Sequence, residues 1–139
     1  MSAYLDTSLL VALFVADAHS DRATSLVGAS DDLILSDLAA AEFSSALAGL
    51  HRMGRLEATH ARSAFADFDA WTDQTCRRVV TASQDMMFAE SVMRRLDLSL
   101  RTPDALHIAM AHRLGVPLAT FDVRMAGDAR RLGVEVVGD

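Results

Sequence analysis

Residues 3–16 read AYLDTSLLVALFVA and place a single acidic side chain between two apolar segments. Ala3–Leu5 is a short apolar run of the kind that forms a buried strand, and Leu9–Ala16 has the length and composition of a helix. Asp6 stands at the junction and is the only acidic residue before Asp17. A carboxylate at this position either caps the following helix or belongs to a site whose other members lie far along the chain.

Short strands and longer helices alternate along the whole chain, which has no repeat, linker or low-complexity tract. Strands are predicted at Ala3–Leu5, Leu33–Leu35, Val79–Thr81, Pro117–Phe121 and Val134–Val137. Helices are predicted at Leu9–Ala16, Asp21–Val27, Asp37–Arg52, Glu57–Thr72, Gln84–Leu96, Pro103–Leu114 and Val123–Leu132. This order favours one α/β domain over residues 1–139, with a mainly parallel five-stranded sheet between two layers of helices. In such sheets, sites form beyond the carboxyl ends of the strands.

Residues with strong positional preferences mark the ends of one of these helices. Thr102 is followed by Pro103, which predicts a hydroxyl at the N-cap and proline at the first helical position. Gly115 follows Leu114, as a glycine that ends a helix in the left-handed conformation would.

The composition points to a cytoplasmic protein with no membrane partner. Hydrophobic residues make up 51% of the 139 residues, which is enough for a substantial core. Cys76 is the only cysteine, so an internal disulfide is excluded and a reducing compartment is expected. The first apolar run lacks a preceding basic region and is interrupted by Asp6, which is not typical of a signal peptide or a membrane span.

The charge of the chain limits how it could bind nucleic acid. The formal net charge is −6, and all 13 basic residues are arginines. Proteins that hold nucleic acid through charge alone are usually basic. Any contact with nucleic acid must therefore be local or must recruit cations, and mechanisms that need a lysine are excluded.

Four carboxylates stand where the fold alone does not require them: Asp6, Glu42, Asp104 and Asp122. Asp6 and Asp122 follow predicted strands, Asp104 begins a predicted helix, and Glu42 lies in an otherwise apolar and small-residue helix. Taken singly, Asp6 and Asp122 could be helix caps, and Asp104 could be favoured by the helix dipole. Because the ends of parallel strands and the first turns of the following helices meet at one edge, the four could also form one site.

A shared acidic site would need a cation. Two carboxylates about 6 Å apart repel by roughly 3 kcal/mol at an effective dielectric constant near 20. Small sites built from oxygen ligands suit Mg²⁺ or Mn²⁺. The sequence lacks the cysteine and histidine groupings of a structural zinc site.

Four segments carry a family resemblance: YLDTSLL (4–10), SDLAAAEFSSAL (36–47), LRTPDALHIAMA (100–111) and LATFDVRMA (118–126). In this order they resemble the four acidic motifs of PIN domains, and the likeness is strongest to bacterial toxins of the VapC type. DTS alone is a weak motif, whereas the ordered set of four is specific. The resemblance spans nearly the whole chain. One departure is Val123, where the family often has a polar residue.

The resemblance implies a ribonuclease dependent on Mg²⁺ or Mn²⁺, with Asp6, Glu42, Asp104 and Asp122 as its acidic residues. Ser8 and Thr120 match small hydroxyl residues that line the same pocket. The family places the first strand at the centre of the sheet. Cleavage would leave a 5′-phosphate and a 3′-hydroxyl. Arg101 precedes Asp104 and is the arginine best placed to contact a flanking phosphate of RNA, although a solvated surface arginine is the simpler interpretation.

The resemblance also implies a homodimer and a cognate antitoxin protein as partners. One alternative is a PIN-domain nuclease that processes RNA without an antitoxin. Another class, a Mg²⁺-binding receiver domain of a signalling protein, is disfavoured because Asp6 has no acidic neighbour and the chain has no lysine.

His107, one helical turn after Asp104, either packs in the core or donates a hydrogen bond to a site carboxylate.

Overall fold

The computed structural model describes residues 1–138, in which five strands alternate with seven helices. The strands are β1 (Ser2–Leu5), β2 (Asp32–Ser36), β3 (Cys76–Val79), β4 (Leu118–Ala119) and β5 (Val136–Val137). The helices are α1 (Thr7–Phe14), α2 (Ser20–Gly28), α3 (Asp37–Arg52), α4 (Ala58–Thr75), α5 (Ser83–Met93), α6 (Thr102–Leu114) and α7 (Val123–Arg131). The predicted α/β fold is confirmed.

The strands form one sheet in the order β3-β2-β1-β4-β5. Every pair is parallel, including β1 with β2 and β1 with β4. The first strand is therefore central, as the family resemblance implied. Because all strands run the same way, the turns that follow them gather at one edge of the sheet.

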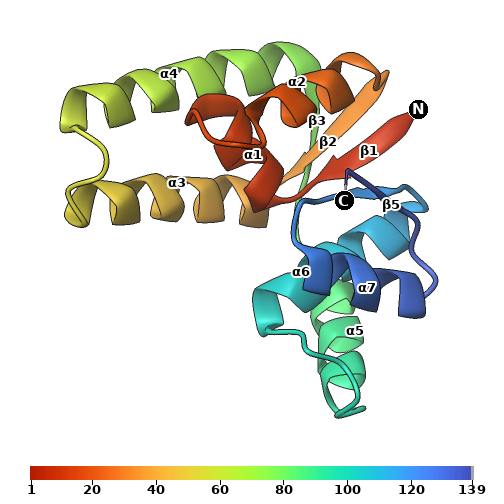
Figure 1. Ribbon diagram of the computed structural model, residues 1–139. Helices are drawn as coiled ribbons and strands as arrows, with labels where there is room; N and C mark the ends of the chain where they lie inside the picture. The colour runs from red at the N-terminus through yellow and green to blue at the C-terminus, as the bar shows by residue number, and fades with distance from the viewer. Residues whose placement is uncertain (139) are drawn as a thin grey trace.

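Helices cover both faces of the sheet (Figure 1), with α1 to α4 on one face and α5 to α7 on the other. Alternate residues of β1 pack against the two layers of helices, since successive side chains of a strand point to opposite faces. Ala3 and Leu5 pack into the core of the first layer, and Tyr4 packs into that of the second. All three are fully buried, as expected for a central strand of a parallel sheet that helices cover on both faces.

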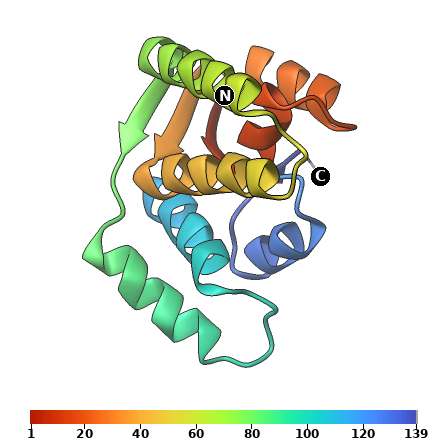
Figure 2. The ribbon, with the colours of Figure 1, turned by 90° about the vertical axis from the view of Figure 1, so that its left-hand side faces the viewer.

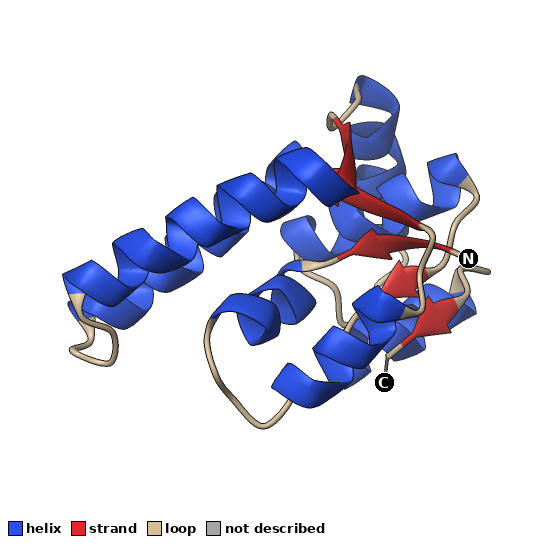
Figure 3. Ribbon diagram, turned by 90° about the horizontal axis from the view of Figure 1, so that it is seen from above, coloured by secondary structure: helices blue, strands red, loops and turns tan. Residues whose placement is uncertain are grey.

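Helix α3 connects the two layers. It contacts α4 on one side and α6 on the other, an arrangement visible in Figure 2. Together α3 and α4 extend well beyond the sheet as a long helical pair (Figure 3). The start of α3 lies at the edge where strands β1 and β4 end. The contact between α3 and α6 brings Glu42, on α3, toward the second layer.

The prediction for the third strand was wrong by three residues. The strand was expected at Val79–Thr81 but β3 spans Cys76–Val79. It lies at the edge of the sheet, and its two arginines are exposed, so the segment lacks the apolar run of a buried strand. Arg77 instead reaches across to Asp32 on β2, with Nη2 2.9 Å from Oδ2. The last two strands are also shorter than predicted.

Between residues 1 and 138, none of the helices combines the length and the apolar character that crossing a membrane requires.

Candidate active site

The four predicted carboxylates line one cavity at the carboxyl edge of the sheet. Asp6 follows β1, Asp122 follows β4, Glu42 lies in the second turn of α3 and Asp104 in the first turn of α6. The cavity has a volume of about 140 Å³ and is also lined by Thr7, Ser8, His107 and Met125. Segments more than 100 residues apart in the sequence thus meet at one acidic cavity, as the order of strands and helices predicted.

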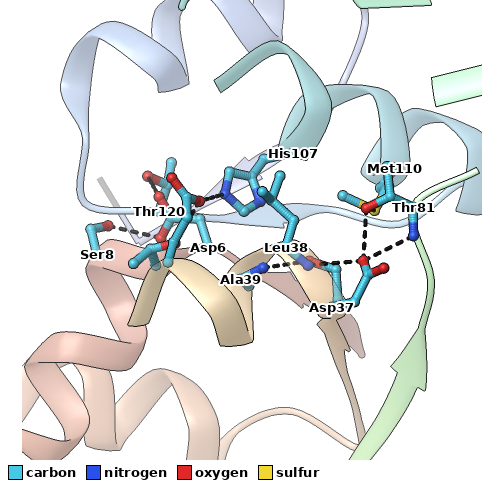
Figure 4. A network of polar contacts seen from close by, with 12 residues as sticks. Asp6, Ser8, Asp37, Leu38, Ala39, Thr81, His107, Met110 and Thr120 are labelled. Carbon is cyan, nitrogen blue, oxygen red and sulfur yellow. Dashed lines mark hydrogen bonds and ion pairs between the residues drawn. The ribbon is translucent and has the colours of Figure 1, made fainter. Parts of the chain in front are cut away.

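Asp6 is both a helix cap and a member of the cavity. Its Oδ1 accepts hydrogen bonds from Leu9 N at 3.2 Å and Ser8 Oγ at 2.8 Å, and its Oδ2 accepts one from Thr120 Oγ1 at 2.7 Å. The side chain is 2% exposed. Burial raises the pKa of Asp6, although the hydrogen bonds from Thr120 and Ser8 oppose this effect. Figure 4 shows Asp6, Ser8 and Thr120 gathered in one cluster.

Thr120 connects Asp6 to Asp122. Its Oγ1 donates to Asp6 and accepts a hydrogen bond from Asp122 N at 3.0 Å. Asp122 in turn caps α7, because its Oδ1 accepts from Arg124 N at 3.0 Å and Met125 N at 3.1 Å. One buried hydroxyl therefore joins the carboxylate of Asp6 to the backbone of Asp122.

Glu42 is held by donors from both layers of the fold. Its Oε1 accepts a hydrogen bond from Thr7 Oγ1 at 2.9 Å and lies 2.5 Å from His107 Nε2. Burial alone would raise the pKa of Glu42, but the contacts with His107 and Thr7 outweigh it, so the pKa is lowered. His107 is 2% exposed, so it is both a packed helix residue and a hydrogen-bond partner of a site carboxylate.

Asp104 fixes the start of α6, one residue earlier than predicted. The helix begins at Thr102, and Arg101 occupies the N-cap position in an extended conformation. Asp104 Oδ2 accepts a hydrogen bond from Arg101 N at 3.0 Å. The expectation that Thr102 would be the cap was therefore wrong, because Asp104 satisfies the free N–H group from inside the helix. The Arg101 side chain is exposed and does not line the cavity.

The sequence did not single out Thr7 or Met125, and it left the role of His107 open. Thr7 lies inside the DTS motif, and its position next to Asp6 was the only available signal. Met125 is a buried residue of α7 with no distinguishing pattern. The contacts of Thr7 and His107 with Glu42 depend on how α1, α3 and α6 pack, which sequence periodicity does not reveal.

The cavity has the donor chemistry of a site for a hard divalent cation. Glu42 Oε2, Asp104 Oδ1 and Asp122 Oδ2 accept no hydrogen bond from any of the described residues. Carboxylate oxygens are preferred ligands of Mg²⁺ and Mn²⁺. As they stand, however, no three His, Cys, Asp or Glu side chains among residues 1–138 are grouped tightly enough to hold an ion. These residues nevertheless fit such a cation chemically, because Mg²⁺ retains several water ligands and is usually bound by only one or two carboxylates.

The family model described as "PIN domain" matches residues 3–127. Ribonuclease VapC46 of Mycobacterium tuberculosis is 33% identical over 137 residues, which cover 96% of this chain and 95% of that protein. The match to the family model extends over all four acidic segments.

Solved structures with the same fold include two bacterial proteins. VapC20 of Mycobacterium tuberculosis, named as a sarcin–ricin loop cleaving toxin, has a TM-score of 0.71 at 20% identity, covering 91% of this chain and 94% of its own. A chain of VapBC2 from Rickettsia felis, bound to promoter DNA, has a TM-score of 0.70 at 12% identity, covering 98% of this chain and 97% of its own. The fold, the acidic cavity and the match over most of the sequence lead to one conclusion: the chain belongs to the PIN domain family.

Proposed function

We propose that the protein is a metal-dependent ribonuclease and the toxin of a toxin–antitoxin pair. The observation that carries this proposal is the meeting of four carboxylates at one small cavity in a chain of the PIN domain family. The identity to a VapC ribonuclease supports RNA as the substrate. Ribonucleases of this family generally depend on divalent metal ions.

Asp6, Glu42, Asp104 and Asp122 would hold Mg²⁺ or Mn²⁺ in the proposed site. When bound, the ion lowers the pKa of a water molecule and offsets negative charge on the phosphate that is attacked. Ser8 and Thr120 orient Asp6 through direct hydrogen bonds. The carboxylates also supply an acceptor that can orient the attacking water. No side-chain nucleophile is required, and hydrolysis would leave a 5′-phosphate and a 3′-hydroxyl.

The acidic charge of the chain is compatible with RNA binding in this proposal. A cation at the cavity provides positive charge at the phosphate that is cut, so the surface does not have to be basic throughout. Arg101 is exposed, and its backbone N–H donates to Asp104, a residue of the cavity; both observations support a contact with the RNA. We therefore assign it a contact with a neighbouring phosphate of the RNA.

A cognate antitoxin and a second copy of the chain are the proposed protein partners. Support for the antitoxin comes from the fold shared with VapBC2, whose structure is of a complex bound to promoter DNA. An arginine of the antitoxin could enter the acidic cavity, since guanidinium groups pair strongly with carboxylates.

The experiment is a ribonuclease assay on the purified protein, with Mg²⁺, with Mn²⁺, and with a chelator. Wild-type protein should cleave RNA only with added metal and leave 5′-phosphate ends. Asp6→Asn and Asp104→Asn should each lose more than about 100-fold of the rate, because even partners of metal ligands are typically worth 10–100-fold. Asp73→Asn, at an exposed position on α4, is the control. Cleavage without metal, or full activity of both site variants, would contradict the mechanism.

The toxin role needs a separate measurement in cells. Induced expression of the wild-type chain should arrest bacterial growth, whereas Asp104→Asn should not. Co-expression of a short neighbouring gene that encodes a DNA-binding domain and a C-terminal tail should restore growth. Cleavage in vitro without any growth arrest would instead favour an RNA-processing nuclease that has no antitoxin.

A further inference from the structure

A chain of buried hydrogen bonds leads from the core of the protein to the acidic cavity. Tyr4 Oη lies 2.7 Å from Ser36 Oγ and 2.7 Å from His107 Nδ1. On its other side, His107 Nε2 lies 2.5 Å from Glu42 Oε1. Tyr4 and Ser36 are fully buried and His107 is 2% exposed. Figure 4 shows His107 reaching toward the cluster around Asp6. Strands β1 and β2 and helices α3 and α6 all contribute to this chain.

The direction of each hydrogen bond follows from its neighbours. Ser36 Oγ accepts from Ala39 N at 3.0 Å, because Ser36 caps α3, and its own hydroxyl proton is then available to Tyr4 Oη. Tyr4 can in turn donate to His107 Nδ1, which is a stronger acceptor than the Met110 thioether at 3.9 Å. An ionised carboxylate only accepts. His107 Nε2 therefore carries a proton and donates it to Glu42, whichever way the Tyr4–His107 bond runs.

These contacts make the two oxygens of Glu42 unequal. Oε1 accepts from both His107 and Thr7, whereas Oε2 has no hydrogen-bond partner among the described residues. One oxygen is thus occupied by the protein and the other remains available to the cavity. The lowered pKa of Glu42 agrees with this arrangement, because both donors favour the ionised form.

We propose that Tyr4 and His107 are positioning residues that hold Glu42 so that Oε2, and not Oε1, is offered to the divalent cation. This inference rests on the proposed function, because it assumes that the cavity binds such a cation. It adds two residues, Tyr4 and His107, that act on the cation through Glu42. Partners that orient metal ligands in this way typically contribute 10–100-fold to affinity or activity. A network with a purely structural role would affect folding stability alone.

The first test needs no variant. Nitrogen-15 NMR of histidine-labelled, metal-free protein reports which ring nitrogens carry protons. We expect His107 Nε2 to be protonated and strongly coupled to its proton, and Nδ1 to shift when Tyr4 is replaced by Phe. An unprotonated Nε2 would overturn the proposal, because the imidazole could not then donate to Glu42.

The second test measures Mn²⁺ affinity by calorimetry in the absence of RNA. His107→Leu should weaken binding by about 10–100-fold, and Tyr4→Phe should weaken it less, because the imidazole keeps its contact with Glu42. His107→Gln should recover most of the affinity, since its amide N–H can replace Nε2–H. Ile108→Val, a fully buried change on the same helix, is the control for general packing. Equal affinities in wild type and His107→Leu would overturn the proposal.

A double substitution separates positioning from structural support. In a Glu42→Ala background, His107→Leu should cause no further loss of Mn²⁺ affinity, because residues that act through one contact are not additive. A further loss as large as in the wild-type background would mean that His107 acts elsewhere. The proposed function and this inference can fail separately. Absence of RNA cleavage by wild type rejects the former, whereas unchanged metal affinity in an active enzyme rejects the latter.

Discussion

At the scale of single residues, Asp6 has two roles that the sequence presented as alternatives. It caps α1 and it faces the cavity, because each oxygen makes different contacts. Burial raises its pKa above the value in the unfolded chain. The carboxyl group of Asp6 therefore binds its proton more tightly in the folded than in the unfolded chain. As the pH rises above the unfolded-state pKa of about 3.9, ionisation of Asp6 lowers the free energy of unfolding.

Asp6→Asn should accordingly stabilise the metal-free protein near neutral pH while abolishing cleavage. Asparagine is as good an N-cap as aspartate, so the bond to Leu9 N is retained and the buried charge is lost. The amide group of asparagine can donate to Thr120 Oγ1, where Oδ2 of Asp6 accepts. Thermal unfolding in a chelator, followed from pH 8 to pH 4, should give a higher Tm for the variant at pH 8. This difference should shrink as the pH falls toward 4. A variant that is less stable by the same amount at every pH would show that the charge of Asp6 is not a burden to the apo fold.

Residues that act through long-range contacts were the hardest to predict. Asp6, Glu42, Asp104 and Asp122 were found because a carboxylate at the end of a strand or in an apolar helix is unusual, whatever it touches. Thr7 has no such signal, since a hydroxyl near a helix start is common. The contact between Tyr4 and His107 joins residues 103 positions apart, so only the packing of β1 against α6 reveals it.

At the scale of helices and strands, boundaries were predicted well where one residue type has a strong conformational preference. Gly115 ends α6 in the left-handed conformation, with φ of 66°, as its place after Leu114 indicated. The edge strand β3 was misplaced because Arg77 and Arg78 are exposed, and an edge strand needs no continuous apolar run. The pattern of hydrophobic residues locates buried strands and is weak where one side of the strand faces solvent.

Gly115→Ala should therefore destabilise the protein without affecting the site. A left-handed conformation costs a residue with a Cβ atom about 1–2 kcal/mol, and no atom lies within 4 Å of the position that Cβ would take. Chemical denaturation should show this loss, with kcat unchanged. Gly127→Ala is the matched control, since it lies inside α7 with equally open surroundings. There alanine should be neutral or stabilising by up to about 1 kcal/mol. The same loss in both variants would contradict the conformational argument.

At the scale of the whole molecule, the site belongs to both layers of the fold. Glu42 comes from the first layer, Asp104 and His107 come from the second, and Asp6 and Asp122 follow strands of the sheet between them. Their carboxylates repel one another when ionised, and three of them have an oxygen without a hydrogen-bond partner among residues 1–138. The metal-free fold thus retains an electrostatic cost that a divalent cation would remove.

Binding of Mn²⁺ should consequently stabilise the entire domain. A ligand that binds only the folded state adds about 2.7 kcal/mol at 100 times its Kd, so Tm should rise with Mn²⁺ concentration and fall again on chelation. The increase should be abolished in Asp6→Asn and Asp104→Asn and retained in Asp73→Asn, whose carboxylate lies on the exposed side of α4. Since the ligands come from both layers, the two layers should unfold together at every metal concentration. A rise in Tm that persists in the site variants would place the stabilising ion somewhere other than the acidic cavity.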